Sequence, residues 1–346
     1  MEIGEHIALL LSGRLPFAAY RFPDGNKVQL LTGQVKIFEP EKDKEGFVFH
    51  PYDRTQEPAL LITPQEQLTY QTVVIPETAV EPNDDFYSAD FEQYCAQVNR
   101  AVAAISRLEA QKLVLSRIIP APGLDASSAA DAFLALCQRF PNAFTYIFSD
   151  GNNRHWMGAT PETLVSFDQQ QAYTVALAGT LPANGDLQWT SKERKEQQIV
   201  TDYIVKVLSD SGAENIMAGE ALEAPAGHVV HLKTEIRFDI PPQLSRFDIV
   251  EALHPTPAVC GNPRPAAMRL IKDIEKHQRA YYTGFLGPWS TNGPASLFVN
   301  LRCMRFSEQR SLLYVGGGIT AESVAEREWA ETTWKAATLT WLFDAK

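Results

Sequence analysis

The sequence predicts an α/β protein of the α+β type, in which large antiparallel or mixed sheets are covered by helices. Segments with strand character arrive in blocks, with helical segments between the blocks, whereas a parallel sheet would alternate one strand with one helix. Among the 346 residues, 45% are hydrophobic and 21% are charged, which is typical of a folded globular protein. This length suits about two domains or one large α/β domain.

The first 85 residues are expected to be rich in strands. Short extended segments are predicted at 17–22, 28–32, 47–50 and 60–63, where apolar residues run between turn residues such as Pro, Asp and Gly. A loop rich in proline and acidic residues follows from Pro76 to Asp85. Residues 86–346 form a second part, which carries the motifs described below.

Helices and strands of the second part follow from hydrophobic periodicity. Apolar residues recur at helical spacing in 86–110, 129–139, 192–209, 266–277 and 323–343. Stretches dense in apolar and β-branched residues predict strands at 112–119, 144–148, 163–167, 172–176, 229–234, 237–239, 280–286, 295–306 and 311–315. The sequence has no P-loop and no GxGxxG motif, which argues against nucleotide chemistry.

The net charge and the cysteine content limit the classes of partner and the cellular compartment that we expect for this protein. The formal net charge of −11 disfavours binding to nucleic-acid backbones and to anionic membranes. The apolar run from Ile7 to Leu11 is too short, and follows Glu2 and Glu5, so a signal peptide is not expected. The four cysteines lack CxxC spacing. We therefore expect a cytoplasmic protein without nucleic-acid or membrane partners. The sequence does not encode the oligomeric state, and a monomer is assumed.

Two acidic residues extend the apolar stripe of the helix predicted at 192–209. Continuing the stripe of Ile199, Val200 and Tyr203 backwards by three or four residues reaches Glu196 and then Glu193. Both carboxylates are therefore expected on the buried face. Alternatively, they are solvated acids of the first turn that favour the helix dipole.

The last helix repeats this arrangement. Glu328, Glu331 and Lys335 lie on one face, and the same face continues to Leu339 and Leu342. An ion pair between Glu331 and Lys335 within the helix is the alternative explanation. If all four carboxylates converge, they repel one another, and a hard divalent cation with oxygen ligands would relieve that cost. Mg²⁺, held by one or two carboxylates plus water and substrate oxygens, fits best.

Two further features suggest anion binding. Gly316, Gly317 and Gly318 follow a predicted strand and would expose backbone N–H groups to a ligand, although a tight connection explains them equally simply. Arg302 lies among apolar residues of another predicted strand, where a guanidinium often binds a carboxylate in bidentate fashion. The alternative is an edge-strand arginine that points outward.

Eight strings in the chain resemble, in order, the motifs of the chorismate-utilising enzymes. The resemblance covers about Gln111 to the C-terminus, and the first ~100 residues carry no comparable motif, which suits the variable start of that family. The strings are Lys112-Leu-Val-Leu-Ser-Arg117, Ala159-Thr-Pro-Glu162, Leu177-Ala-Gly-Thr180, Lys192-Glu-Arg-Lys-Glu196, Leu253-His-Pro-Thr-Pro-Ala258, Arg279-Ala-Tyr-Tyr-Thr-Gly284, Asn300-Leu-Arg302 and Glu328-Trp-Ala-Glu331-Thr-Thr-Trp-Lys335.

Within that family, Lys112 together with Leu177-Ala-Gly-Thr180 resembles the isochorismate synthases. Anthranilate synthases carry Gln at the position of Lys112, and aminodeoxychorismate synthases carry a Lys in a Pro-Ile-Lys-Gly-Thr motif. Salicylate synthases share the lysine and remain the alternative. A non-catalytic chorismate-binding paralogue would lack one of the acid, base or metal residues. The family often has Glu-His where this chain has Glu196-Gln197, which should alter only a neighbouring contact.

The resemblance implies a fold and a set of roles. The fold would be a single domain over 1–346, with two stacked, mostly antiparallel sheets, helices outside and the site in a cleft. Lys112 would act as base and Glu162 as acid, and Glu196 and Glu331 would bind Mg²⁺ with support from Glu193 and Glu328. Chorismate would be the substrate, and menaquinone biosynthesis the expected pathway. The expected substrate-binding residues are Thr180, His254, Tyr282, Arg302, Gly316, Gly317, Gly318 and Lys335.

Overall fold

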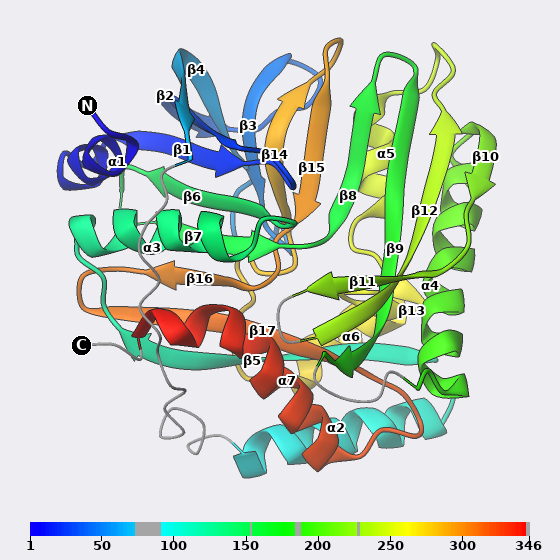
Figure 1. Ribbon diagram of the computed structural model, residues 1–346. Helices are drawn as coiled ribbons and strands as arrows, with labels where there is room; N and C mark the ends of the chain where they lie inside the picture. Colours follow the sequence, from blue (N-terminus) through cyan, green and yellow to red (C-terminus); the bar gives the residue numbers. More distant parts are fainter. Residues whose placement is uncertain (73–90, 153, 184–187, 227–228, 344–346) are drawn as a thin grey trace.

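The computed structural model describes residues 1–72, 91–152, 154–183, 188–226 and 229–343 (Figure 1). The loop expected at 76–85 and the helix start expected at 86–90 lie outside these residues. The helices are α1 (Ile3–Ser12), α2 (Phe91–Ser106), α3 (Ala126–Arg139), α4 (Ser191–Asp210), α5 (Arg246–Leu253), α6 (Arg264–Ile274) and α7 (Ala325–Thr340), which a 3-10 turn (Trp341–Phe343) follows.

The strands form one connected antiparallel sheet. They are β1 (Pro16–Arg21), β2 (Lys27–Ile37), β3 (Glu45–His50), β4 (Leu60–Gln71), β5 (Lys112–Pro122), β6 (Phe144–Asp150), β7 (His155–Thr160), β8 (Thr163–Asp168), β9 (Gln171–Pro182), β10 (Glu214–Ala218), β11 (Leu222–Ala226), β12 (Val229–Asp239), β13 (Gly261–Asn262), β14 (Phe285–Ser290), β15 (Ala295–Val299), β16 (Cys303–Phe306) and β17 (Arg310–Ile319). Their lateral order is β13–β5–β17–β16–β7–β6–β1–β2–β4–β3–β14–β15–β8–β9–β12, and β12 also pairs with β10 and β11.

This sheet turns back on itself, so that two layers face each other. Strands far apart in the lateral order touch through aromatic rings: Phe49 of β3 stacks on Phe148 of β6 at 4.3 Å, and Phe144 of β6 stacks on Phe298 of β15 at 4.0 Å between ring centroids. Such pairs contribute about 0.5–1.5 kcal/mol beyond their buried area. The expected fold class is confirmed, and the two stacked sheets are layers of one connected sheet.

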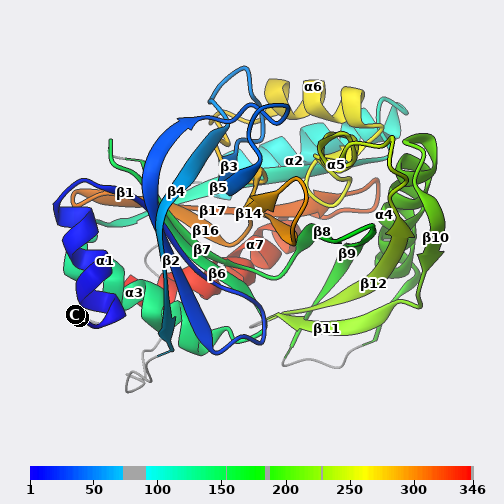
Figure 2. The ribbon, with the colours of Figure 1, turned by 90° about the horizontal axis from the view of Figure 1, so that it is seen from above.

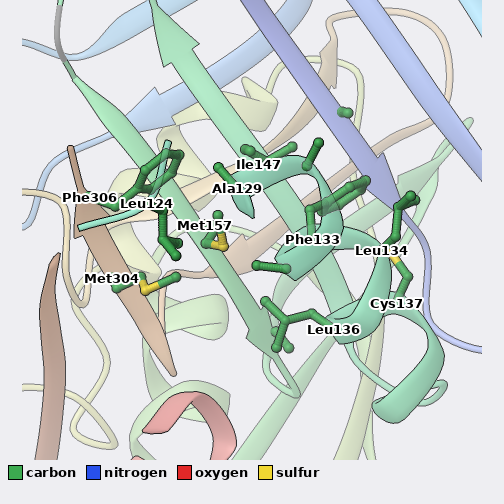
Figure 3. Close-up of a cluster of buried hydrophobic side chains, with 14 of the residues drawn as sticks. Leu124, Ala129, Phe133, Leu134, Leu136, Cys137, Ile147, Met157, Met304 and Phe306 are labelled. Carbon is green, nitrogen blue, oxygen red and sulfur yellow. The ribbon is translucent and has the colours of Figure 1, made fainter. Parts of the chain in front are cut away.

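Helices cover the outer faces of the layers. α1 and α3 lie at one end of the molecule and α4 at the other (Figure 2). Phe133 and Leu136 of α3 pack on Met157 of β7 and Met304 of β16 in one buried cluster (Figure 3). A second cluster joins α4 and α5 to β8, β9 and β12, and a third joins α2 and α6 to β5. Each apolar helix face thus fixes one outer surface of the sheet.

Several boundaries differ from the sequence-based expectation. The strand expected at 295–306 is broken into β15 and β16, because Asn300 turns inward to accept a hydrogen bond from Tyr146 Oη at 2.6 Å and Arg302 adopts a φ of 47°. Residues 280–284, expected in a strand, form a turn in which Ala280 and Thr283 have positive φ values. Periodicity did not reveal these departures because they depend on tertiary contacts.

Candidate active site

A pocket of about 690 Å³ collects most of the predicted site residues. It lies where β5, β9, β17, α4 and α7 meet the connection between β7 and β8. Ten of the predicted residues line it: Lys112, Glu162, Thr180, Glu196, Tyr282, Arg302, Gly316, Gly318, Glu331 and Lys335. The other four, His254, Gly317, Glu193 and Glu328, lie outside this lining.

Helix α4 places Glu196 in the pocket through its buried stripe. Val200, Ile204 and Leu208 are fully buried and four residues apart, and one step further back along the same line is Glu196. Its Oε1 atom lies 2.7 Å from Lys112 Nζ. Lys112 is only 1% exposed, so this ion pair holds a buried amine against a carboxylate at the wall of the pocket.

Glu193 serves the start of α4 instead. Its Oε2 atom accepts a hydrogen bond from the backbone N–H of Thr190 at 3.0 Å and another from the Thr190 hydroxyl. The pattern Thr-x-x-Glu is a capping box, which satisfies backbone donors at a helix start. The first-turn alternative therefore applies to Glu193. Gln197, the departure from the family pattern, donates to the Ala176 carbonyl and to Thr234 Oγ1, both at 3.0 Å, which ties α4 to β9 and β12.

Helix α7 contributes Glu331 and Lys335. Lys335 Nζ lies 2.7 Å from Glu331 Oε1 and also donates to the Gly316 carbonyl at 3.2 Å. The ion pair within the helix, which was the alternative explanation, forms, and it lies at the pocket. Glu328 is 2% exposed and lies beside Gly317, on the other face of β17.

The four carboxylates do not all meet at the pocket, because Glu193 caps the start of α4, whereas Glu328 and Glu331 both lie beside Gly317. Within the described residues, no group of three or more His, Cys, Asp or Glu side chains could hold a metal ion. Two carboxylates, Glu196 and Glu331, line the pocket, and each is compensated by a lysine. Two carboxylates at one pocket remain compatible with Mg²⁺, which prefers one or two such ligands and fills its other positions with water or substrate oxygens.

The glycine run lies inside β17 rather than after it. Residues 316–318 pair with residues 114–116 of β5. A Cβ on Gly318 would lie 2.5 Å from Glu196 Oε1 and 3.0 Å from Lys112 Cε, and one on Gly316 would lie 2.8 Å from Tyr282 Oη. The glycines at 316 and 318 thus give room for the charged pair and for the tyrosine hydroxyl. These neighbours come from distant elements, so the sequence could not reveal this role.

Glu162 has the properties of an acid. It lies in the short connection between β7 and β8, where its carbonyl accepts the Val299 N–H at 3.0 Å, and it is 3% exposed. Burial raises the pKa of Glu162 to about 8, although the nearby charges of Lys112 and Lys335 act in the opposite direction. The carboxyl therefore carries a proton at neutral pH and can donate it.

His231, which the sequence analysis missed, sets the position of Arg302. Arg302 Nη2 lies 2.8 Å from His231 Nε2. A guanidinium can only donate, so Nε2 accepts, and the ring proton is on Nδ1, which lies 3.1 Å from the Gly179 carbonyl and from Thr180 Oγ1. Burial lowers the pKa of His231 well below its usual value, and the charges of Arg302 and Lys335 add to the effect. The sequence did offer one indication of this role: His231 is a polar residue in the mostly apolar strand predicted at 229–234.

We expect His231→Leu to raise the KM for the substrate by about 10–100-fold and to change kcat less, because a lost hydrogen bond to a charged group costs about 1.5–3 kcal/mol. Steady-state kinetics would separate the two constants. His231→Gln is the matched control, since its amide oxygen can accept from Arg302 and should restore most of the affinity. Equal KM values for the leucine variant and the wild type would contradict the assigned role.

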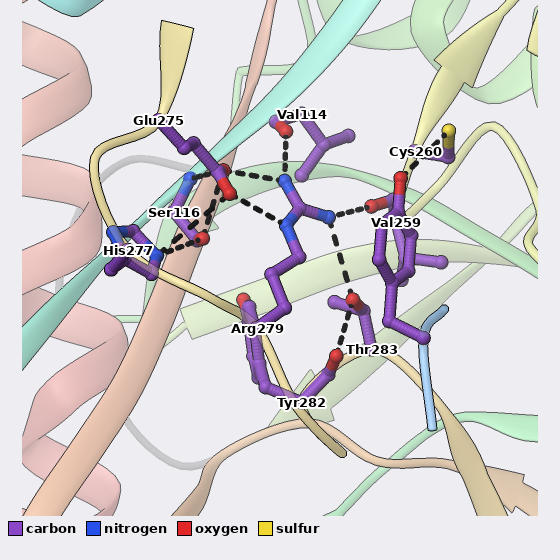
Figure 4. A network of polar contacts seen from close by, with 10 residues as sticks. Val114, Ser116, Val259, Cys260, Glu275, His277, Arg279, Tyr282 and Thr283 are labelled. Carbon is purple, nitrogen blue, oxygen red and sulfur yellow. Dashed lines mark hydrogen bonds and ion pairs between the residues drawn. The ribbon is translucent and has the colours of Figure 1, made fainter. Parts of the chain in front are cut away.

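A buried ion pair joins three walls of the pocket (Figure 4). Arg279 donates to the carbonyls of Val114 at 2.6 Å and Val259 at 2.9 Å, to Thr283 Oγ1 at 3.4 Å, and to both oxygens of Glu275. Val114, Val259 and Thr283 all line the pocket. Arg279 therefore fixes their relative positions, and this explains an arginine in the string that begins at 279.

His254 supports the same wall without lining the pocket. Its Nε2 atom lies 3.0 Å from the Thr283 carbonyl, and burial lowers the pKa of His254 to about 4. The ring is neutral at pH 7 and can donate to that carbonyl. His254 does not line this pocket, and its predicted contact with the substrate stays a prediction.

The fold and the pocket define an acid–base enzyme site: a lysine and a glutamic acid with a raised pKa share one pocket with an arginine and two lysine-paired carboxylates. The model of the chorismate binding enzyme family matches residues 19–340. The chain therefore belongs to the chorismate binding enzymes.

Within the family, the relatives include isochorismate synthases. The chain is 28% identical to the vibriobactin-specific isochorismate synthase of Vibrio cholerae, over 72% of this chain and 66% of that protein, slightly less than two thirds of its length. A crystal structure from Bacillus anthracis, assigned as the 2,3-dihydroxybenzoate-specific isochorismate synthase DhbC, has a TM-score of 0.83 and 25% identity over 99% of both chains. MenF of Escherichia coli, the menaquinone-specific isochorismate synthase, has a TM-score of 0.80 at 22% identity over 97% of this chain and 91% of its own, which shows the shared fold.

No helix among the described residues is long and apolar enough to cross a membrane.

Proposed function

We propose that the protein is an isochorismate synthase, which converts chorismate to isochorismate with the help of Mg²⁺. The observation that carries the proposal is that Lys112 and Glu162, whose pKa is raised to about 8, line the same pocket. A non-catalytic paralogue would be expected to lack at least one of the acid, base and metal residues, and all four are in place: Lys112, Glu162, Glu196 and Glu331.

The charges of the pocket suit a dianionic substrate. Chorismate carries two carboxylates. Lys112, Arg302 and Lys335 supply three positive charges, while Glu196 and Glu331 supply two negative ones and Glu162 is neutral. Burial lowers the pKa of Arg302 to about 10, so its guanidinium stays charged at neutral pH and can bind one carboxylate.

The reaction moves a hydroxyl group across the ring. In the proposed mechanism, the ammonium group of Lys112 first loses its proton to solvent. The neutral amine then accepts a proton from a water molecule, whose oxygen attacks C2 of chorismate. The ring double bond shifts, and the bond from C4 to its hydroxyl breaks. Glu162 donates its proton to the departing oxygen, which leaves as water. Arg302 and Tyr282 hold the enolpyruvyl carboxylate, and Thr180 lies at the ring end. A positioned acid or base contributes about 10²–10⁴-fold to the rate.

Glu196 and Glu331 are the residues that would hold Mg²⁺. Their oxygens are the hard ligands that this ion prefers, and Gly318 leaves room for the carboxylate of Glu196. When bound, Mg²⁺ would supply positive charge to the ring carboxylate of the substrate. Lys112 and Lys335 compensate these two carboxylates in the structure described here.

We expect chorismate to be converted to isochorismate in the presence of Mg²⁺, with no pyruvate released. Chelation by EDTA should remove the activity and added Mg²⁺ should restore it. Product chromatography together with a coupled pyruvate assay would test this. Pyruvate formed at the rate of chorismate loss would favour the alternative, a salicylate synthase, and full activity in EDTA would contradict the metal assignment.

We further propose that the whole chain forms one chorismate-binding domain that acts as a cytoplasmic monomer. Strands of the first 85 residues are interleaved with later ones, since β1 pairs with β6 and β3 with β14. The four cysteines are free thiols, which suits a reducing compartment. Menaquinone biosynthesis is the proposed pathway, and siderophore biosynthesis is the alternative.

A further inference from the structure

Three oxygen atoms surround the missing side chain of Gly317. Residues alternate across a strand, so Gly317 faces away from the pocket that Gly316 and Gly318 line. A Cβ on Gly317 would have Glu328 Oε2 at 3.6 Å, Glu331 Oε1 at 3.7 Å and Tyr94 Oη at 3.7 Å as its nearest neighbours. Two carboxylates of α7, those of Glu328 and of the proposed metal ligand Glu331, thus converge with one phenol of α2 beside Gly317.

Tyr94 is held firmly in this position. Its side chain is 1% exposed, and its ring packs against Trp329 of α7 at 5.8 Å between centroids. Its hydroxyl has no hydrogen-bond partner among the residues that the structure describes. A buried hydroxyl left without a partner costs about 1–3 kcal/mol, so native structures rarely retain one without water or another group.

A bridging water would give the Tyr94 hydroxyl a hydrogen-bond partner and link it to the two carboxylates. The phenol can donate and accept, and carboxylates can accept, yet no direct bond joins Tyr94 to either carboxylate. Polar groups that face one another beyond hydrogen-bond distance are commonly linked by a buried water with two to four polar partners. The space beside Gly317 offers three such partners.

We propose that a bound water beside Gly317 links the Tyr94 hydroxyl to Glu328 and Glu331, and that Tyr94 thereby orients these carboxylates for the divalent cation. The inference rests on the metal site of the proposed function. Tyr94 is a positioning residue in this scheme, because it acts on the cation only through the carboxylates. Groups that orient metal ligands in this way typically change metal affinity by about 10–100-fold when they are removed.

The test is the affinity for Mn²⁺, used as a paramagnetic substitute for Mg²⁺, measured by electron paramagnetic resonance without substrate. Tyr94→Phe removes the hydroxyl and keeps the ring. Gly317→Ala places a methyl group at ordinary contact distance from the three oxygens and displaces the water without a clash. We expect each variant to weaken Mn²⁺ binding by about 10–100-fold, and the double variant to be no weaker than either one, since both remove the same link.

Tyr20→Phe is the matched control, because Tyr20 is a buried tyrosine that packs between Phe47 and Phe144, and it should bind Mn²⁺ like the wild type. Wild-type affinity in Tyr94→Phe would overturn the inference and leave the metal site standing. Additive losses in the double variant would exclude the shared water. A wild-type protein that binds no Mn²⁺ would overturn the metal site and this inference together.

Discussion

Lys112→Ala is expected to slow isochorismate formation by about 10²–10⁴-fold, since the variant lacks the group proposed to accept the proton of the attacking water. Lys112 is 1% exposed and lines the pocket. Its charge is close enough to Glu162 to act to lower the pKa of that carboxyl. No other lysine lines the pocket except Lys335, which is engaged by Glu331 and the Gly316 carbonyl among the residues that the structure describes. Turnover of chorismate under saturating Mg²⁺ is the measurement.

The same variant separates catalysis from metal binding. Removing Lys112 leaves the carboxylate of Glu196 without its ion-pair partner at 2.7 Å, so Mg²⁺ binding should be retained or strengthened. Lys206→Ala, which removes an exposed lysine paired with Asp210 on α4, is the control and should leave both properties unchanged. Wild-type turnover in Lys112→Ala would refute the assignment of the base. Loss of Mg²⁺ binding in that variant would show that the lysine supports the metal site instead.

Elements with a long apolar pattern were predictable to within a few residues. The helix predicted at 192–209 is α4 (Ser191–Asp210), and the strand predicted at 112–119 is the core of β5. A helix or strand that buries one face has apolar residues at a regular spacing, so the spacing in the sequence identifies the element that forms in the fold. α1 was missed because the run from Ile7 to Leu11 is short, although its buried side chains pack on α3.

The family resemblance named most of the pocket residues, whereas periodicity alone identified a site residue only where that residue continues an apolar stripe. Glu196 continues the apolar stripe of α4 and lies in the pocket. Glu193, three residues earlier on the same stripe, caps the start of the helix instead. The pattern Thr190-x-x-Glu193 was readable as a capping box, and it competes with the stripe for the same residue. A local motif of this kind should override the periodic extrapolation in the first turn of a helix.

Functions that depend on neighbours from distant segments were beyond the sequence. The glycines at 316 and 318 make room for side chains of β5, α4 and the turn at 280–284. Arg302 lies in a break of the strand with a φ of 47°, and its partner His231 comes from β12, 71 positions earlier. The identity of each residue was visible, but its contacts follow from the tertiary fold alone.

Glu162 should give the reaction an upper pH limit. Burial raises its pKa to about 8, so the acid form declines as the pH rises through that value, and kcat/KM should fall with a slope of one proton. Glu162→Gln has no proton to donate and should lose about 10²–10⁴-fold in turnover at every pH, while it still binds chorismate. A pH profile of the wild type from 6 to about 10 would test the limit. A rate that stays flat through pH 9 would remove Glu162 from the role of acid.

The raised pKa of Glu162 should also lower the free energy of unfolding at neutral pH. At a pH below the ordinary pKa of 4.5, Glu162 is protonated in both the folded and the unfolded chain and contributes no pH dependence. Between 4.5 and about 8 the unfolded chain loses the proton and the folded chain keeps it, so the free energy of unfolding falls as the pH rises, by on the order of a few kcal/mol in total. Glu162→Gln lacks this titration. Its thermal midpoint relative to the wild type should therefore rise steadily from pH 5 to pH 8, and a difference that does not change with pH would mean that the carboxyl is ionised in the folded pocket.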